Sequence, residues 1–320
     1  MVAETCMHPL DTISTRLKVQ GVDVAEKGYQ GVFGTARTMI VQEGPGSLFR
    51  GVSATLLGAM PSSALYFAVY ETSKHYGMQH MLSITREANG GEDVPLTEWQ
   101  EDLVHLGAGV ASELGSSFVW VPFEVIKSRL QISSPGYTGT VSGLWKIAQQ
   151  EGISGLFAGY RACLFLDCTA SGLQFLFYER IRRGLKKRRE ERAETRAETV
   201  VDDTVSWPLF AALTGSGDLR ESVEETAEDL VAGACSGGLA AFLSNPLDVV
   251  SVRLMTQRED IEAASLRRYH YKGFWDCLVS VARHEGVRGL WSGSLARTLS
   301  ILPLSALQFA IYEKMKTCFA

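Results

Sequence analysis

One four-part pattern occurs three times along the chain, and this repeat constrains the fold more than any other feature. Its first part reads "HPLDTISTRL" from residue 8, "VPFEVIKSRL" from residue 121 and "NPLDVVSVRL" from residue 245. Each copy holds Pro, a carboxylate two residues later, and Arg seven residues after the Pro. An aromatic–Gly element, a turn fitting E-G-x-x-x-L-[F/W]-x-G, and an apolar segment ending in "YE" then follow in the same order. A pattern of this kind at a spacing of roughly 110–130 residues predicts three copies of one structural unit.

Apolar stretches of membrane length accompany the repeats, although the mean hydropathy of the whole chain is only +0.03. Residues 51–70 and 230–246 carry no charge, while 103–122, 156–178 and 289–312 each contain only one or two ionisable groups. At 1.5 Å per residue, about 20 helical residues cross the hydrocarbon core of a bilayer. Isolated charges in such spans are tolerated where they face a polar interior. The sequence therefore predicts a multi-pass membrane protein built around a polar cavity.

Composition disfavours several other classes of protein. A net charge of −5 and a pI of about 5.8 offer no basic surface for nucleic acid. The six cysteines form no C-x-x-C pair, so neither a metal site nor a disulfide framework is predicted. The six histidines are dispersed, and no nucleophile–base constellation or phosphate loop occurs. We therefore expect that the protein is not an enzyme, has no catalytic residue and binds no cofactor.

Each unit is predicted to contain a spanning helix, a short amphipathic helix and a second spanning helix, which gives six spanning helices. Repeats are expected at 1–76, 101–183 and 229–320, separated by a polar linker at 77–100 and a charged insertion at 184–228. Only eight residues precede the first motif proline, against about twenty in the other repeats, so the first helix is expected to be truncated.

The triplicated P-x-[D/E]-x-x-[K/R] signature, together with the Glu-Gly turns and the "YE" endings, resembles the mitochondrial carrier family of solute transporters over nearly the whole chain. The resemblance implies an all-α membrane protein with six tilted helices in three tandem repeats of pseudo-threefold symmetry. It implies a monomer in the inner mitochondrial membrane whose central cavity opens alternately to either side. It also implies cardiolipin binding at the aromatic–Gly elements, through Gly31, Gly139 and Gly273.

In this family, carboxylates of the proline motifs pair with basic residues of the neighbouring motif and close the matrix side. The carboxylates here are Asp11, Glu124 and Asp248, and the residues three positions beyond them are Ser14, Lys127 and Ser251. Only the Asp11–Lys127 pair is therefore expected. Glu124 and Asp248 are expected to lose their cationic partners, which predicts a weak matrix gate.

The resemblance implies a second gate, on the cytosolic side, formed by the "[F/Y]-[D/E]-x-x-[K/R]" endings of the even-numbered helices. Its residues are Glu71 with Lys74, Glu179 with Arg182, and Glu313 with Lys316. Because all three copies are complete, we expect this gate to be intact.

Substrate selection in the family is assigned to cavity positions of the even helices. By carry-over, these are Gly58 and Ala59, Leu166 and Asp167, and Ser300 and Ile301. None of them is Arg or Lys, which disfavours nucleotides and dicarboxylates. Glu113 lies nine residues before its motif proline and Glu4 five before its own, so helical periodicity places both on one cavity face. Together with Asp167, these two glutamates give three carboxylates against the single cation of Arg297. This excess of negative charge predicts a cationic solute.

The segments around these positions are most similar to the S-adenosylmethionine carriers and the yeast mitochondrial magnesium exporter, and "GAMPSSALYFAVYE" also resembles the mitoferrins. The leading expectation is a transporter of a small cationic solute such as S-adenosylmethionine, with no resident metal. One alternative is a carrier of a divalent metal ion, Mg²⁺ or iron. Another is a carrier-fold membrane adaptor that no longer transports, favoured by the two missing gate cations and the charged insertion.

Overall fold

The computed structural model describes residues 2–20, 31–88, 95–133, 137, 139–200, 216–257 and 271–304. These ranges form helices and short connections and contain no strand. The all-α architecture expected from the repeats is confirmed.

Long helices alternate with shorter ones along the chain. The helices that carry the proline motifs are α1 (Val2–Val19), α4 (Glu98–Gln131) and α9 (Ser216–Thr256). The other long helices are α3 (Val52–Ala88) and α7 (Tyr160–Val200), and residues 294–304 begin the sixth. Each motif proline lies inside its helix. Proline removes one backbone hydrogen bond and crowds the preceding turn, so these are the points where the helices can bend.

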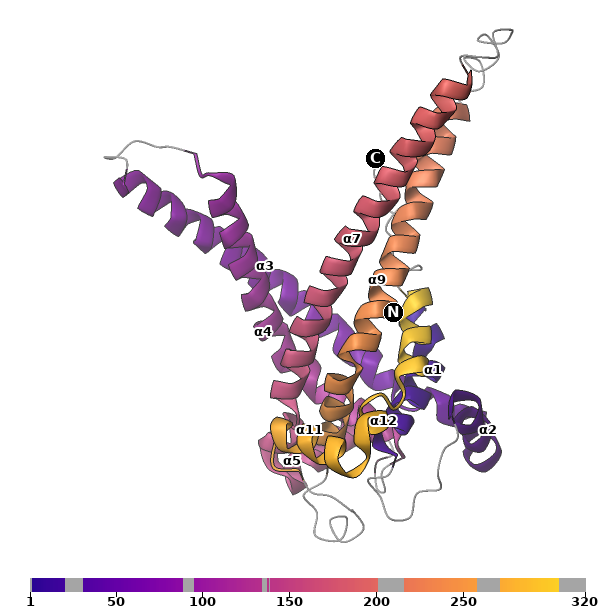
Figure 1. Cartoon of the computed structure of the whole chain (residues 1–320). Coiled ribbons are helices and arrows are strands. Elements are labelled where there is room, and N and C mark those ends of the chain that lie inside the picture. The colour runs from indigo at the N-terminus through magenta and orange to yellow at the C-terminus, as the bar shows by residue number, and fades with distance from the viewer. Residues whose placement is uncertain are drawn as a thin grey trace.

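The short helices form a layer across one end of the molecule (Figure 1). In order they are α2 (Gly31–Glu43) with the 3₁₀ turn η1 (Pro45–Phe49), α5 (Thr140–Gln150) with α6 (Gly152–Leu156), and α11 (Phe274–His284) with α12 (Gly286–Leu290). Each couple connects the two long helices of one repeat. The predicted order of elements within a repeat therefore occurs three times.

Backbone geometry explains the two glycines of the E-G-x-x-x-L-[F/W]-x-G turns. The first glycine of each turn has φ between 71° and 84°, and the last between 74° and 87°. Side chains other than hydrogen disfavour this left-handed region. The last glycine also touches the next repeat. A Cβ added at Gly51, Gly159 or Gly293 would lie 3.1, 3.3 or 2.8 Å from the carbonyl oxygen of Lys127, Ser251 or Ser14. The three contacts join the repeats in a closed ring.

The long helices separate from one another away from this layer. Helix α3 packs along α4 and α7 along α9, and Figure 1 shows the two pairs diverging from the end that carries the short helices. Two helices are longer than expected, since α3 continues through Ala88 into the predicted linker and α7 through Val200 into the predicted insertion. Both extensions lack proline, and the extension of α7 is rich in Glu, Arg, Lys and Ala, which favour helix. The end of α7 runs beside the start of α9 (Figure 1).

Large apolar side chains are exposed on these helices, as expected of helices that contact lipid. Phe67, Phe118 and Phe175 are 60–65% exposed on α3, α4 and α7. Within the described ranges, two segments, Pro45–Glu87 and Leu230–Thr256, are long and apolar enough to cross a membrane. The apolar parts of α4 and α7 each contain charged residues, among them Glu113 and Asp167. An apolar exterior around a charged interior is the arrangement expected of a membrane protein with a polar cavity.

Candidate functional site

A cavity of about 280 Å³ lies where α1, α4, α7, α9 and residues 294–304 converge. Its lining is unusually rich in charge. The carboxylates are Glu4, Asp11, Glu124, Asp167 and Asp248, and the cations are Lys18, Lys127 and Arg297. With five carboxylates against three cations, the lining carries an excess of two negative charges, histidine being taken as neutral.

Two of the proline-motif residues meet across the bundle. Nζ of Lys127 lies 3.0 Å from Oδ2 of Asp11, so α4 and α1 are joined at the floor of the cavity. Gln131, one turn beyond Lys127, donates a 3.0 Å hydrogen bond to the same oxygen of Asp11. Its own amide oxygen accepts a 2.9 Å bond from Thr15. Gln131 thereby fixes the carboxylate in the position where it meets Lys127.

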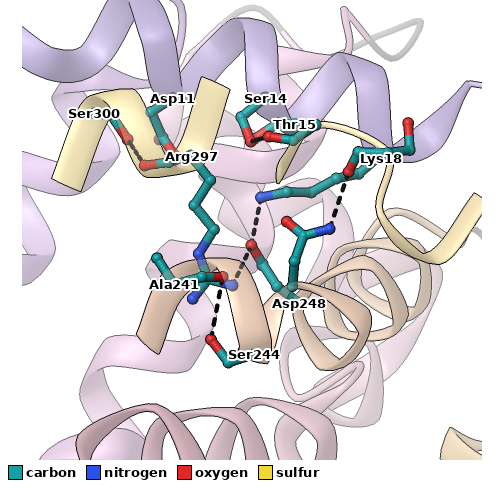
Figure 2. Close-up of polar contacts among 12 residues, drawn as sticks. Asp11, Ser14, Thr15, Lys18, Ala241, Ser244, Asp248, Arg297 and Ser300 are labelled. Atoms are coloured by element: carbon teal, nitrogen blue, oxygen red, sulfur yellow. Dashed lines mark hydrogen bonds and ion pairs between the residues drawn. The ribbon is translucent and has the colours of Figure 1, made fainter. Parts of the chain in front are cut away.

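The third motif carboxylate does have cationic partners, contrary to expectation. Nζ of Lys18 lies 2.5 Å and Nη1 of Arg297 lies 3.0 Å from Oδ2 of Asp248. Figure 2 shows both side chains reaching Asp248 from different segments of the chain. Lys18 is four residues beyond Ser14 and so lies one turn further along the same face of α1. The missing cation at Ser14 is thus replaced by one from the next turn.

Glu124 is the motif carboxylate whose cation comes from its own helix. Its Oε1 lies 3.1 Å from Nζ of Lys127, three residues further along α4. Lys127 therefore forms ion pairs with both Asp11 and Glu124. Within the described ranges, no cation from another helix pairs with Glu124. We call the six residues of this level the gate layer: Asp11, Glu124, Asp248, Lys18, Lys127 and Arg297.

A second charged level lies closer to the short helices and was not assigned a role from the sequence. It joins the arginine seven residues after each motif proline to the glutamate of the Glu-Gly turn in the same repeat. We call it the arginine layer, and its pairs are Arg16–Glu43, Arg129–Glu151 and Arg253–Glu285. The three arginines are at most 3% exposed. Each pair is bidentate, as in the 2.5 and 2.7 Å bonds from Arg129 to Glu151.

The arginine layer also connects the repeats. Nε of Arg16 donates to the carbonyl oxygen of Gln131 at 2.8 Å, and the equivalent bonds run from Arg129 to Met255 at 3.1 Å and from Arg253 to Lys18 at 2.9 Å. Each arginine thus ties its own repeat to the next. The hydrogen bonds and charge of Arg16 also hold the pKa of Glu43 below its ordinary value. The signal in the sequence was the threefold recurrence of Arg and Glu at fixed places.

The residues assigned to substrate binding divide into two groups. Leu166, Asp167, Arg297, Ser300 and Ile301 line the cavity. Asp167 accepts a long 3.5 Å hydrogen bond from the thiol of Cys163, and no cation pairs with it within the described ranges.

The other three assigned residues lie outside this lining. Gly58 packs on α4, because a Cβ there would lie 2.7 Å from that of Phe123, and its place is set by helix contact. Ala59 follows it on α3 and is half-buried. Glu113 is half-buried on α4 and interacts electrostatically with Asp167.

The residues assigned to the cytosolic gate lie on the helices that diverge. Glu179 pairs with Arg183 of its own helix at 3.2 Å, while the guanidinium of Arg182 lies 5.9 Å from the ring centre of Tyr178. No ion pair of Glu71 or Lys74 occurs among the residues that the structure describes. Glu313 and Lys316 lie outside the described residues.

The glycines assigned to lipid binding stand at the starts of the short helices. Gly31 is the first residue of α2, and Gly139 and Gly273 immediately precede α5 and α11. The first N–H groups of a helix have no partner within it and attract anions.

The fold and the charged cavity together define an all-α membrane carrier with three repeats. The chain matches the family described as "Mitochondrial carrier protein" over residues 1–81, 98–189 and 222–320, and it belongs to this family of transporters. One relative is "Probable S-adenosylmethionine carrier 2, chloroplastic" of Arabidopsis thaliana, with 30% identity over 99% of this chain and 70% of the relative. "Mitoferrin" of Dictyostelium discoideum is 28% identical over 98% and 89% of the two chains. "Nicotinamide adenine dinucleotide transporter 2, mitochondrial" of Arabidopsis thaliana is 28% identical over 99% and 76%.

Proposed function

We propose that the protein transports a small cationic solute, with S-adenosylmethionine as the leading candidate, by alternating access across the inner mitochondrial membrane. The observation that carries the proposal is the charge of the cavity, where five carboxylates face three cations. An excess of negative charge inside low-dielectric walls attracts cations and repels anions. The similarity to S-adenosylmethionine carriers favours the same class of solute.

Asp167 is the residue that we assign to the positive group of the solute. It lines the cavity from α7, and the hydrogen bond that it accepts from the described part of the chain comes from a thiol, which is a weak donor. Asp11 and Asp248, in contrast, already have lysine or arginine partners. A cation entering the cavity therefore gains most by meeting Asp167.

The two charged levels support a transport cycle. The gate layer joins α1 to α4 through Asp11–Lys127 and α1 to α9 through Lys18–Asp248. It therefore closes the bundle at the end that carries the short helices, which we call the narrow end. The helix pairs diverge at the other end (Figure 1). We assign the described conformation to the state that receives solute from the cytosolic side. Closure of the second gate, through the "YE" endings, would accompany the opening of the gate layer, so that the cavity is open to one side at a time.

We assign the starts of α2, α5 and α11 to cardiolipin phosphates and the working state to a monomer. The adaptor alternative loses part of its basis, since Asp248 has two cations instead of none. A divalent metal remains the second candidate, supported by the carboxylates and by the similarity to a mitoferrin.

Ligand-dependent unfolding temperature of the purified protein in detergent tests the proposal, since a ligand of the folded state raises it by mass action. We expect S-adenosylmethionine to stabilise the protein more than S-adenosylhomocysteine, which lacks the sulfonium charge. Asp167→Asn should weaken S-adenosylmethionine binding about tenfold or more, because it removes a charged contact. Asp102→Asn, at an exposed position near the start of α4, is the matched control. Stabilisation by Mg²⁺ or Fe²⁺ alone would assign the protein to metal transport.

A further inference from the structure

Arg297 is held in the cavity by an incomplete contact. Its side chain is 14% exposed, and Nη1 lies 3.0 Å from Oδ2 of Asp248. The two atoms are not aligned as a hydrogen bond, and the buried Nη1 makes none to the rest of the described protein. This differs from Arg129, which makes two short hydrogen bonds to Glu151. Arg297 therefore retains hydrogen-bonding capacity that a ligand can use.

Asp248 does not depend on Arg297 alone. Lys18, whose side chain is 4% exposed, lies closer to the same oxygen, at 2.5 Å. Removal of one partner from a buried ion pair is costly when it leaves a charge without compensation. Here Arg297 can turn toward a ligand while Asp248 stays paired with Lys18. Figure 2 shows this shared arrangement.

Arg297 and Asp167 line the same cavity from two different segments, residues 294–304 and α7. Arg297 offers a planar guanidinium that can form two parallel hydrogen bonds to a carboxylate. Asp167 offers a carboxylate whose donor, among the residues that the structure describes, is the thiol of Cys163. A solute with groups of both signs can engage both without leaving either charge buried alone.

We propose that Arg297 is the receptor for a carboxylate of the solute, so that the transported class is a zwitterion with a net positive charge and not a simple cation or a metal ion. This inference rests on the proposed function for the positive half of the solute. Binding would exchange the Arg297–Asp248 contact for one between Arg297 and the solute. Because that contact links residues 294–304 to α9, its exchange loosens the gate layer when solute is bound.

Matched pairs of cations with and without a carboxylate test this assignment: S-adenosylmethionine against its decarboxylated form, and arginine against agmatine. Dissociation constants come from the unfolding temperature as a function of ligand concentration, measured on the full-length protein. We expect the wild type to prefer the carboxylated member of at least one pair by about tenfold to a hundredfold, the value of a charged hydrogen bond.

Arg297→Gln should remove this preference and leave the affinity for the decarboxylated member nearly unchanged, whereas Arg297→Lys should restore part of it. Arg161→Gln removes an exposed arginine from the start of α7, outside the cavity lining, and should leave the preference intact. Loss of preference without loss of affinity is a result that a purely structural role of Arg297 would not produce.

Three other outcomes separate this inference from the proposed function. If both members of each pair bind the wild type equally, the Arg297 assignment is wrong and cation transport stands. If carboxylates without a cation bind as tightly as the zwitterions and Arg297→Gln abolishes their binding, the assignment stands and the cationic proposal is wrong. If only metal ions bind, both are wrong.

Discussion

The arginine layer and the gate layer are both built around the proline-motif residues of α1, α4 and α9, yet the arginine layer keeps the threefold symmetry of the repeats and the gate layer has lost it. In the arginine layer, each arginine makes the same bidentate pair and the same bond to the next repeat. In the gate layer, Asp11 takes its cation from the next repeat, Glu124 from its own helix, and Asp248 from two different segments. We infer that the symmetric layer holds the bundle together, and that the gate layer has diverged with the solute.

The largest effect should follow from breaking the symmetric layer. Arg129→Gln leaves the carboxylate of Glu151, which is 2% exposed, buried without its cation. Removal of one partner of a buried pair costs about 3–5 kcal/mol. We expect a large fall in the unfolding temperature of the purified protein. Arg183→Gln, which removes an exposed partner of Glu179, is the control and should have no measurable effect. Equal behaviour of the two variants would show that the arginine layer is not structural.

A smaller loss is expected from Lys18→Gln in the gate layer, because Asp248 keeps Arg297. Loss of one charged hydrogen-bond partner corresponds to about 1.5–3 kcal/mol. Ser14→Lys should recover stability in this background, since it places a cation where Lys127 stands in the second repeat. The contact of Lys127 with Gly51 shows that a lysine fits beside the turn glycine there. The measurement is again the unfolding temperature, with Lys74→Gln as the control.

If Ser14→Lys fails to recover the Lys18→Gln loss, Lys18 does not substitute for the missing motif cation. That result would separate the gate layer from the pairing that the family resemblance implies.

A modest gain is expected from restoring the pair that is absent. Ser251→Lys offers Glu124 a cation from α9, while Lys127 remains with Asp11. We expect the closed narrow end to be stabilised by about 1 kcal/mol and solute uptake into proteoliposomes to slow. In contrast, Ser14→Lys alone should change uptake less, because Asp248 already has two cations. Equal slowing by both substitutions would contradict the assignment of cations described here.

The repeated motifs sufficed to predict the arrangement of helices, because each motif position has one physical task. The turn glycines, for example, are required by positive φ and by the close approach of the next repeat. The Asp11–Lys127 pair was expected from the family resemblance, which joins the motif carboxylate of one repeat to the basic residue of the next. Comparison of the three repeats thus predicts a contact only where the repeats have kept the same residues at the same positions.

The remaining contacts could not be predicted because they join positions that are not equivalent. Lys18 reaches Asp248 from one turn beyond the motif position, a shift that a long side chain allows. Arg297 was assigned to the cavity, but its contact with Asp248 depends on how residues 294–304 pack against α9. Gly58 was assigned to the cavity by its position in the repeat, but its contact with Phe123 of another repeat could not be read from that position. The Lys18 and Gly58 contacts depend on packing between repeats, and the Arg297 contact depends on packing between two segments of the third repeat; the repeated motifs encode neither.

The smallest expected effect concerns unequal burial inside the symmetric layer. The side chain of Glu43 is 26% exposed, whereas that of Glu151 is 2% exposed. Glu43→Gln should therefore destabilise the protein by only about 1 kcal/mol, because the amide oxygen can still accept a hydrogen bond from Arg16, which also keeps its bonds to Gln131 and Ser133. Arg16 lowers the pKa of Glu43 from its ordinary value of 4.5, so the stability that it contributes is present above about that pH. It is lost as the pH falls through the lower pKa of the folded state.

The difference in unfolding temperature between wild type and Glu43→Gln should accordingly be constant near neutral pH and shrink when the pH falls below 4.5. Measurements from pH 7 down to pH 3.5 would show this, with Glu87→Gln on the exposed end of α3 as a control whose difference stays near zero. A difference that grows as the pH falls would mean that Glu43 is bound more strongly when protonated. In that event the arginine layer would be symmetric in geometry but not in charge, and the contrast with the gate layer would be weaker than the contacts indicate.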